Sequence, residues 1–350
     1  MRETMKWRHW LRQARMFALA LIPMLLAIEI VLRLWFMSPS WKVPDPELGL
    51  LNIPHARIVY SQEGWGVHHT NSTGWLGPEL QDPKPKTRVL LLGNSFTEAL
   101  HVAPEESFAA LAQQQLPHSE FVNTAQSGWS TVPELVLLRR IYKELEPDVV
   151  VTQIHTLVAF EPSETHLEVD ASGSFKIVPP QHRDDFRTKL RGSTEGLLRH
   201  SALLTMLFQR ANELWTEQRT RLAAKFDARD QSGNARSDAT DEELAALGWT
   251  LDRMAEVTPS LIVLSFGGVD YGQNHCGSTA PERDRRIREV VESRGLRLVD
   301  PTDAFCAEYA RTGQPSHGFH NAEMGKGHLN ARGHRIVADL LARAVRETTR

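Results

Sequence analysis

The chain has 350 residues, enough for one large domain or two smaller ones with a substantial buried core. Hydrophobic residues make up 41% and charged residues 24% of the chain, which is ordinary for a globular protein. The formal net charge of -3 lacks the basic excess of a nucleic-acid-binding domain, so we expect no nucleic-acid partner.

The N-terminus predicts a membrane anchor. Residues 1–15 are basic, and the apolar run at 16–37 contains only two charges, Glu29 and Arg33, spaced to pair on one helix face. Because about 20 apolar residues cross a bilayer core and basic flanks stay in the cytoplasm, we expect a cytoplasmic tail at 1–15 and an uncleaved transmembrane signal anchor at 16–37. The protein would then be single-pass in a bacterial inner membrane, with the rest of the chain periplasmic or extracytoplasmic. The alternative is an amphipathic or core-packing helix of a soluble protein.

Residues 38–86 are rich in Pro, Gly, His and Trp and show no long helical period, so we expect a linker followed by short strands or loops. A regular alternation of strands and helices follows. The predicted strands are Arg88–Leu92, Glu120–Asn123, Val149–Ile154, Ser260–Phe266 and Leu296–Val299. The predicted helices are Glu105–Leu116, Thr131–Leu145, Glu242–Val257, Pro281–Arg294 and Ala331–Arg346. This order predicts an α/β fold with a parallel sheet and right-handed crossovers.

An insertion is expected at about 162–240, between the two halves of this pattern. It contains a predicted helix near residues 197–219. Residues 228–240 are polar without any apolar period, which predicts a loop.

The sharpest local signal is the end of the first predicted strand, where Gly93, Asn94 and Ser95 follow an apolar run. Glycine permits a tight turn there, and the carboxyl ends of parallel strands are where α/β proteins place their sites. A serine that opens a helix can also point its own N–H toward developing negative charge. Taken alone, however, a serine in this position is usually a helix cap.

Three sequence blocks strengthen the signal. Gly93–Glu98 resembles the Gly-Asp-Ser block of SGNH/GDSL hydrolases, Asn123–Ser130 their second block, and His328–His334 the last block, which carries the catalytic His. Asn71–Glu79 resembles a segment of membrane-anchored bacterial members. The similarity covers about residues 65–345 apart from the insertion.

This resemblance implies a flavodoxin-like three-layer α/β/α domain over residues 87–346. It also implies that Ser95 attacks an ester carbonyl while His328 takes its proton. The backbone N–H groups of Ser95 and Gly128 would hold the oxyanion. No cofactor is implied.

The chain departs from the family pattern at three places. Asn94 replaces the Asp of Gly-Asp-Ser. The third block lacks its Asn, so Thr156 or His155 would have to donate to the oxyanion instead. No Asp lies just before His328, and the nearest acid is Glu323, which would have to reach the imidazole from a loop.

Other residues leave alternatives open. His317 and His320 have a spacing that chelates metals, but no partner carboxylate is obvious and we expect no metal site. Cys276 and Cys306 form no CxxC pair; they are either one disulfide in an oxidising compartment or two unpaired core residues. Trp65 precedes the main domain and either stacks on a sugar or packs on the core.

The predicted function is ester hydrolysis or acyl transfer on an O-acylated cell-envelope glycan or a similar ester. The alternative is a catalytically degenerate SGNH-fold protein that binds a glycan or partner in the envelope. A cytoplasmic dinucleotide-binding enzyme is disfavoured because the chain lacks Gly-x-Gly-x-x-Gly.

Overall fold

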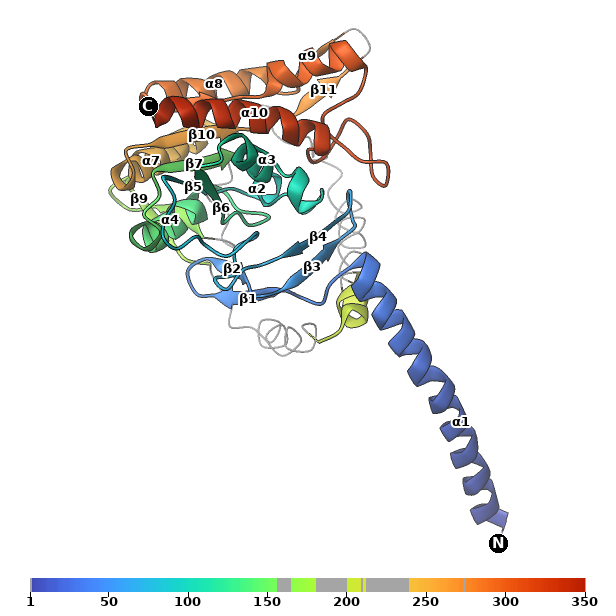
Figure 1. Ribbon diagram of the computed structural model, residues 1–350. Coiled ribbons are helices and arrows are strands. Elements are labelled where there is room, and N and C mark those ends of the chain that lie inside the picture. Colours follow the sequence, from blue (N-terminus) through green and yellow to red (C-terminus); the bar gives the residue numbers. More distant parts are fainter. Residues whose placement is uncertain are drawn as a thin grey trace, which may run out of the picture. The chain divides into compact units, whose positions relative to one another are not determined.

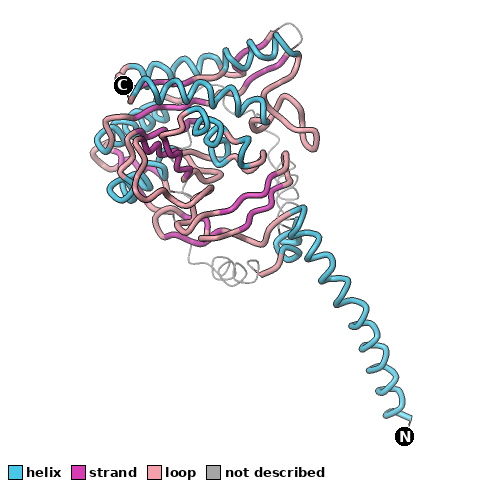
Figure 2. The backbone as a smooth tube through the Cα atoms, in the orientation of Figure 1, coloured by secondary structure: helices cyan, strands magenta, loops and turns pink. Residues whose placement is uncertain are grey.

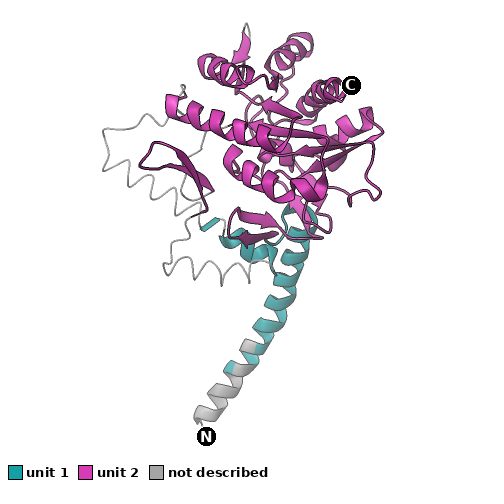
Figure 3. Cartoon of the chain, turned by 90° about the vertical axis from the view of Figure 1, so that its left-hand side faces the viewer, with its two compact units in different colours: residues 1–40, 185–228 teal, residues 41–184, 229–350 magenta. Residues whose placement is uncertain are grey.

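The computed structural model describes residues 2–155, 165–180, 200–208, 210–211, 239–272 and 275–349 (Figure 1). Two compact units divide the chain: residues 1–40 with 185–228, and residues 41–184 with 229–350 (Figure 3). Most of the expected insertion at 162–240 lies outside the described residues, as does nearly all of the loop expected at 228–240. Of the helix expected near 197–219, residues 200–208 and 210–211 are described, and all of these but residues 200 and 201 are helical.

The first unit contains the N-terminal helix. Helix α1 spans Arg2–Val31 and continues as a single π-helical stretch over Leu32–Phe36. Within it, the 22 residues Arg15–Phe36 have a mean hydropathy of 2.3 and are long and apolar enough to cross a membrane, as a signal sequence also would be. Glu29 and Arg33 form the expected pair at 2.5 Å.

The second unit is built on one parallel sheet of five strands. Along the sheet the strand order is β13-β10-β7-β5-β6, and all neighbours are parallel. This is the flavodoxin-like order, in which successive strands are added on one side of β5 and then on its other side, beginning with β7. The strands are β5 (Thr87–Leu91), β6 (Ser119–Asn123), β7 (Val149–Ile154), β10 (Leu261–Ser265) and β13 (Arg297–Val299). Every residue of β6, β7 and β10 is buried, as expected for strands covered on both faces.

Alternate residues of these strands enter two separate hydrophobic clusters, so helices cover both faces. Leu90, Val150 and Val263 pack with one set of helices, and Val89, Val151 and Ile262 with the other. The first set is α4 (Thr131–Leu145), α7 (Asp241–Val257) and α8 (Pro281–Glu292); the second is α3 (Phe108–Gln115), α9 (Thr302–Thr312) and α10 (Ala331–Thr348). The predicted three-layer α/β/α fold is confirmed. Helix α9 was not predicted.

Short antiparallel hairpins surround the sheet, and Figure 2 shows their strands in magenta. The flanking segment forms two of them: β1 (Lys42–Asp45) with β2 (Gly49–Asn52), and β3 (Arg57–Tyr60) with β4 (Gly66–His69). The others are β8 (His166–Val169) with β9 (Phe175–Val178), and β11 (Val269–Tyr271) with β12 (Cys276–Ser278).

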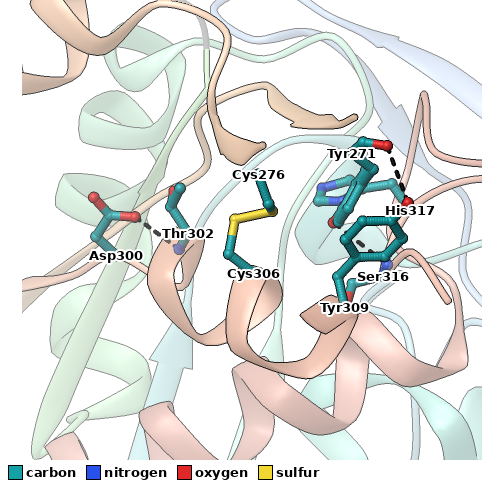
Figure 4. Close-up of a disulfide and its surroundings, with 8 residues drawn as sticks. All are labelled: Tyr271, Cys276, Asp300, Thr302, Cys306, Tyr309, Ser316 and His317. Atoms are coloured by element: carbon teal, nitrogen blue, oxygen red, sulfur yellow. Dashed lines mark hydrogen bonds between the residues drawn. A yellow bond between two sulfur atoms is a disulfide. The ribbon is translucent and has the colours of Figure 1, made fainter. Parts of the chain in front are cut away.

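Cys276 and Cys306 are joined in a disulfide between β12 and α9, with their Cα atoms 5.4 Å apart (Figure 4). Of the two alternatives left open by the sequence, the structure has the disulfide. Beside it the Tyr271 hydroxyl lies 2.6 Å from His317 Nδ1, and Tyr309 donates to the Tyr271 carbonyl. The disulfide therefore lies next to the segment that leads toward His328.

Candidate active site

Ser95 lies at the carboxyl end of β5, where it opens the one-turn helix α2 (Ser95–Glu98). The turn before it requires glycine, because a Cβ on Gly93 would lie 2.5 Å from Thr97 Oγ1. Asn94 caps the helix by accepting a hydrogen bond from Phe96 N at 3.1 Å. From Arg88 to Val102, Ser95 is the only residue that is not buried. The fold thus presents this one side chain to the surface from an otherwise buried strand and turn.

His328 connects this serine to a carboxylate. Its Nε2 lies 2.8 Å from Ser95 Oγ, and its Nδ1 lies 2.6 Å from Glu63 Oε2. A carboxylate only accepts, so Nδ1 carries the proton and the Nε2 lone pair faces the hydroxyl. This is the tautomer that a general base needs to take the proton of Ser95.

Glu63 comes from the loop between β3 and β4. Its second carboxylate oxygen accepts from the backbone N–H of His328 at 2.8 Å, so both oxygens are bound to one residue. The loop is held by Asn321, which accepts from Gly64 N and donates to the carbonyls of Ser61 and Gly64. Gly327, at φ +77°, lets the carboxylate approach, since a Cβ there would lie 2.2 Å from Glu63 Oε1.

The expectation that Glu323 orients His328 is wrong. Glu323 is exposed and pairs with Lys326 at 2.7 Å, while Glu63 occupies Nδ1. Sequence reasoning missed Glu63 because it lies upstream of all three blocks, in a segment taken as flanking. The only available signal was weak: between Leu50 and Pro78, Glu63 is the sole acidic residue, and glycines follow it closely.

A second imidazole stacks on the first. The rings of His101 and His328 have centroids 3.7 Å apart and planes within 18° of each other. Burial is the main cause that lowers the pKa of His101 to about 2, which favours the neutral form of this ring. It packs against His328 without adding a charge that would oppose protonation.

Glu63, His101 and His328 each offer a ligand atom, and these atoms lie within 4.8 Å of one another. Stacked parallel rings direct their in-plane lone pairs side by side rather than at one point, and both nitrogens of His328 already have partners. The arrangement fits a hydrogen-bonded base better than a metal site. His317 is occupied by Tyr271, and burial lowers its pKa to about 4.

The two backbone N–H groups expected to hold the oxyanion belong to Ser95 and Gly128. Among the described residues, neither Ser95 N nor Gly128 N has an acceptor. Gly128 lies in a turn at φ +88°. The neighbouring Ser127 donates from its N–H and its hydroxyl to the buried Glu98, and Lys42 bridges Glu98 and Gln126 at 3.3 and 2.5 Å. Glu98 and Lys42 therefore position the turn that carries Gly128.

In the part of the chain that the structure describes, no residue is assigned as the third donor of the family pattern. Thr156 lies outside the described residues. His155 donates Nδ1–H to the carbonyl of Phe266 at 3.0 Å, and burial lowers its pKa, so its Nε2 is an acceptor. The side-chain oxygen of Gln153 accepts from Asn94 N, while its amide nitrogen Nε2 is buried and has no hydrogen-bond partner among the described residues. The expectation that His155 donates is wrong for its neutral form.

No protein-family model matches this chain, and no curated protein sequence does. Several solved structures are similar to it. They include an acetyl xylan esterase (13% identity, 74% of this chain and 99% of that one, TM-score 0.41) and a lipase/acylhydrolase from Enterococcus faecalis (13% identity, 75% and 96%, TM-score 0.39). A member of the lipolytic G-D-S-L family from Veillonella parvula is 12% identical (73% and 95%, TM-score 0.35).

At these identities and TM-scores the similarities carry no inference about chemistry. The fold itself follows from the strand order and from the positions of the sequence blocks, which lie after β5, after β6 and before α10. It is a three-layer α/β/α fold built on a parallel sheet in flavodoxin-like order, as the sequence predicts.

Proposed function

We propose that this chain is a serine ester hydrolase or acyltransferase. The observation that carries the proposal is the unbroken hydrogen-bond series Ser95–His328–Glu63, with distances of 2.8 and 2.6 Å. Serine is a weak nucleophile at neutral pH, and an adjacent oriented base is what activates it.

The reaction follows from these roles. Ser95 Oγ attacks the ester carbonyl carbon while its proton passes to His328 Nε2. Glu63 stabilises the imidazolium and keeps it in place, and the N–H groups of Ser95 and Gly128 donate to the oxyanion. The intermediate collapses when His328 gives the proton to the leaving alcohol. Water then attacks the acyl-serine in hydrolysis, or a second hydroxyl does so in transfer.

The third oxyanion donor has no assigned residue in the described part of the chain, which favours the alternative of a degenerate binding protein, since losing one such donor typically costs about 10²–10³ in rate. The complete series of acid, base and nucleophile favours catalysis. A protein that only binds has no need to hold Glu63 on both Nδ1 and the backbone N–H of His328.

We further propose that the substrate is an O-acylated cell-envelope glycan. A cavity of about 580 Å³ lies beside His101, and Trp65, Phe319 and Gln314 are among the side chains that line it. Trp65 is 51% exposed, and an exposed indole with polar neighbours suits a sugar ring.

The envelope location is part of this proposal. The apolar N-terminal span and its basic flank favour a single-pass inner-membrane anchor with the remainder periplasmic. The disulfide fits the same side of the membrane, since disulfides persist in oxidising compartments. Alkaline carbonate extraction is expected to leave the full-length protein in the membrane pellet, and release into the supernatant would contradict the anchor.

The activity is tested by hydrolysis of p-nitrophenyl acetate, followed by acetate release from acetylated polysaccharides. The full chain in detergent is compared with Ser95→Ala and, as a control, with Ser293→Ala, which changes an exposed serine just after α8. We expect turnover in the wild type and in the control, and none in Ser95→Ala. Equal rates in all three, or no turnover in a folded wild type, would reject the proposed activity.

A further inference from the structure

The carboxylate of Glu29 lies inside the apolar span, and one short segment of the first unit donates hydrogen bonds to it. The Ser201 hydroxyl donates to Oε2 at 2.8 Å, Ala202 N donates to Oε1 at 2.8 Å, and Leu203 N donates to Oε2 at 2.9 Å. Arg33, the partner of Glu29, donates in turn to the carbonyl of His200 at 2.5 Å. Both charges of the span therefore hold the same turn.

This turn begins a helix. Ser201 caps it by accepting from Leu204 N at 3.2 Å, and its carbonyl accepts from Thr205 N at 3.1 Å. Residues 202–208 are helical. Charged groups at membrane depth are tolerated where they are paired and hydrogen-bonded. The contact with residues 200–203 gives Glu29 such an environment.

The same helix exposes large apolar side chains on one side. Leu204, Leu207 and Phe208 are 43, 54 and 46% exposed, whereas Ala202 and Thr205 are buried. The spacing of the exposed residues is i, i+3 and i+4, which places them on a common face. Exposed apolar groups in such a row mark a surface that something else covers.

Two facts point to lipid as the cover. The span in the same unit also exposes large apolar side chains, among them Leu25, Ile28 and Ile30. Glu29 also lies seven residues before Phe36, about 10 Å along the helix. That depth matches interfacial helices, whose apolar faces are buried about 5–10 Å into the boundary between headgroups and acyl chains.

We propose that residues 200–208 form a second membrane attachment, an interfacial helix whose Leu204, Leu207 and Phe208 contact lipid acyl chains. Glu29 and Arg33 of the anchor fix it at the end of the span nearest Phe36. The proposal depends on the span crossing a bilayer and is independent of the esterase activity.

The test uses the full chain, whose two cysteines are bonded to each other, so that an introduced cysteine can be labelled alone. Leu207→Cys carries an environment-sensitive fluorophore in liposomes of phosphatidylcholine and phosphatidylglycerol with a nitroxide near the headgroup. Leu26→Cys reports on the span, and Val169→Cys, 47% exposed in the second unit, is the control outside the membrane.

We expect the label at 207 to lose about half of its emission to the nitroxide lipid, and the label at 169 to lose little. Adding Glu29→Gln should reduce quenching at 207 and leave that at 26 unchanged. Quenching at 26 without quenching at 207 would overturn the interfacial helix while leaving the anchor intact. No quenching at either position would overturn both.

Discussion

Glu63 and His328 lie 265 positions apart, and their contact depends on a residue that carries no reactive group. Gly327 leaves the space that Glu63 Oε1 occupies. A methyl group there would meet the carboxylate at 2.2 Å and push it from Nδ1. The geometry of the base is therefore set by a missing side chain as much as by the groups that bond.

We predict that Gly327→Ala lowers kcat by about 10²-fold or more, because His328 loses its orienting carboxylate. Gly325→Ala is the matched control: its φ is +87° against +77°, so both variants bear similar backbone strain, but the nearest atom to its added Cβ is 3.7 Å away. Equal losses of kcat in the two variants, measured with p-nitrophenyl acetate, would show that strain alone is responsible.

At the scale of elements, the sequence predicted those whose signals are local. The apolar runs of β5, β6, β7, β10 and β13 and the periodicity of the long helices placed the sheet and the serine turn. Helix α9 was missed because it buries only Phe305 among its residues and shows little periodicity. Glu63 was missed because no local pattern links a hairpin loop to a histidine so distant in the chain. That pairing arises only when the β3–β4 hairpin packs on the segment Leu100–Val102.

The disulfide fastens two such elements, β12 and α9, close to the loop that holds His328. The His317 side chain is hydrogen-bonded to Tyr271, and its backbone forms an antiparallel bridge with Leu329. Leu329 directly follows His328, so this part of the fold helps to hold His328 in place. Closing a loop across 30 positions is worth about 3.7 kcal/mol in the chain-entropy model.

We therefore predict that the double variant Cys276→Ser, Cys306→Ser unfolds at lower denaturant concentration, with a loss of about 3.7 kcal/mol in the free energy of unfolding. Wild type kept in dithiothreitol should show the same loss, which separates the bond from the substitution. If the denaturant midpoint of unfolding is unchanged in both the double variant and the reduced wild type, the disulfide does not stabilise the fold.

At the scale of the whole molecule, buried titratable groups make stability depend on pH. Burial lowers the pKa of His101 to about 2, of His317 to about 4 and of His334 to about 3, and it raises the pKa of Glu134 to about 8. In the unfolded chain these histidines bind protons below about pH 6.5, whereas in the folded protein they stay neutral. Their contribution to the free energy of unfolding is therefore highest above pH 6.5 and falls as the pH drops toward the pKa values of the folded state. Glu134 acts in the opposite sense, because the folded protein keeps its proton while the unfolded chain loses it. Its contribution to the free energy of unfolding is therefore lost as the pH rises from about 4.5 to 8.

These signs predict that stability is greatest near pH 6.5, with a steep fall on the acid side and a shallow one up to pH 8. Each buried histidine contributes a slope of at most about 1.4 kcal/mol per pH unit. Unfolding free energies measured from pH 4.5 to 8 should show a shallower acid limb in His334→Gln and a flatter alkaline limb in Glu134→Gln. The exposed His69→Gln should leave both limbs as they are, and a wild-type curve without an acid limb would contradict the assignment.

Fluorophosphonate labelling tests most directly whether Glu63, His328 and Ser95 act together as an activated serine. The full chain is compared with Ser95→Ala, His328→Ala, Glu63→Gln and Glu323→Gln. We predict rapid labelling of the wild type and of Glu323→Gln, none in Ser95→Ala, and rates at least about 10²-fold lower in His328→Ala and Glu63→Gln. Labelling of Glu63→Gln at the wild-type rate, or no labelling of a folded wild type, would contradict the account.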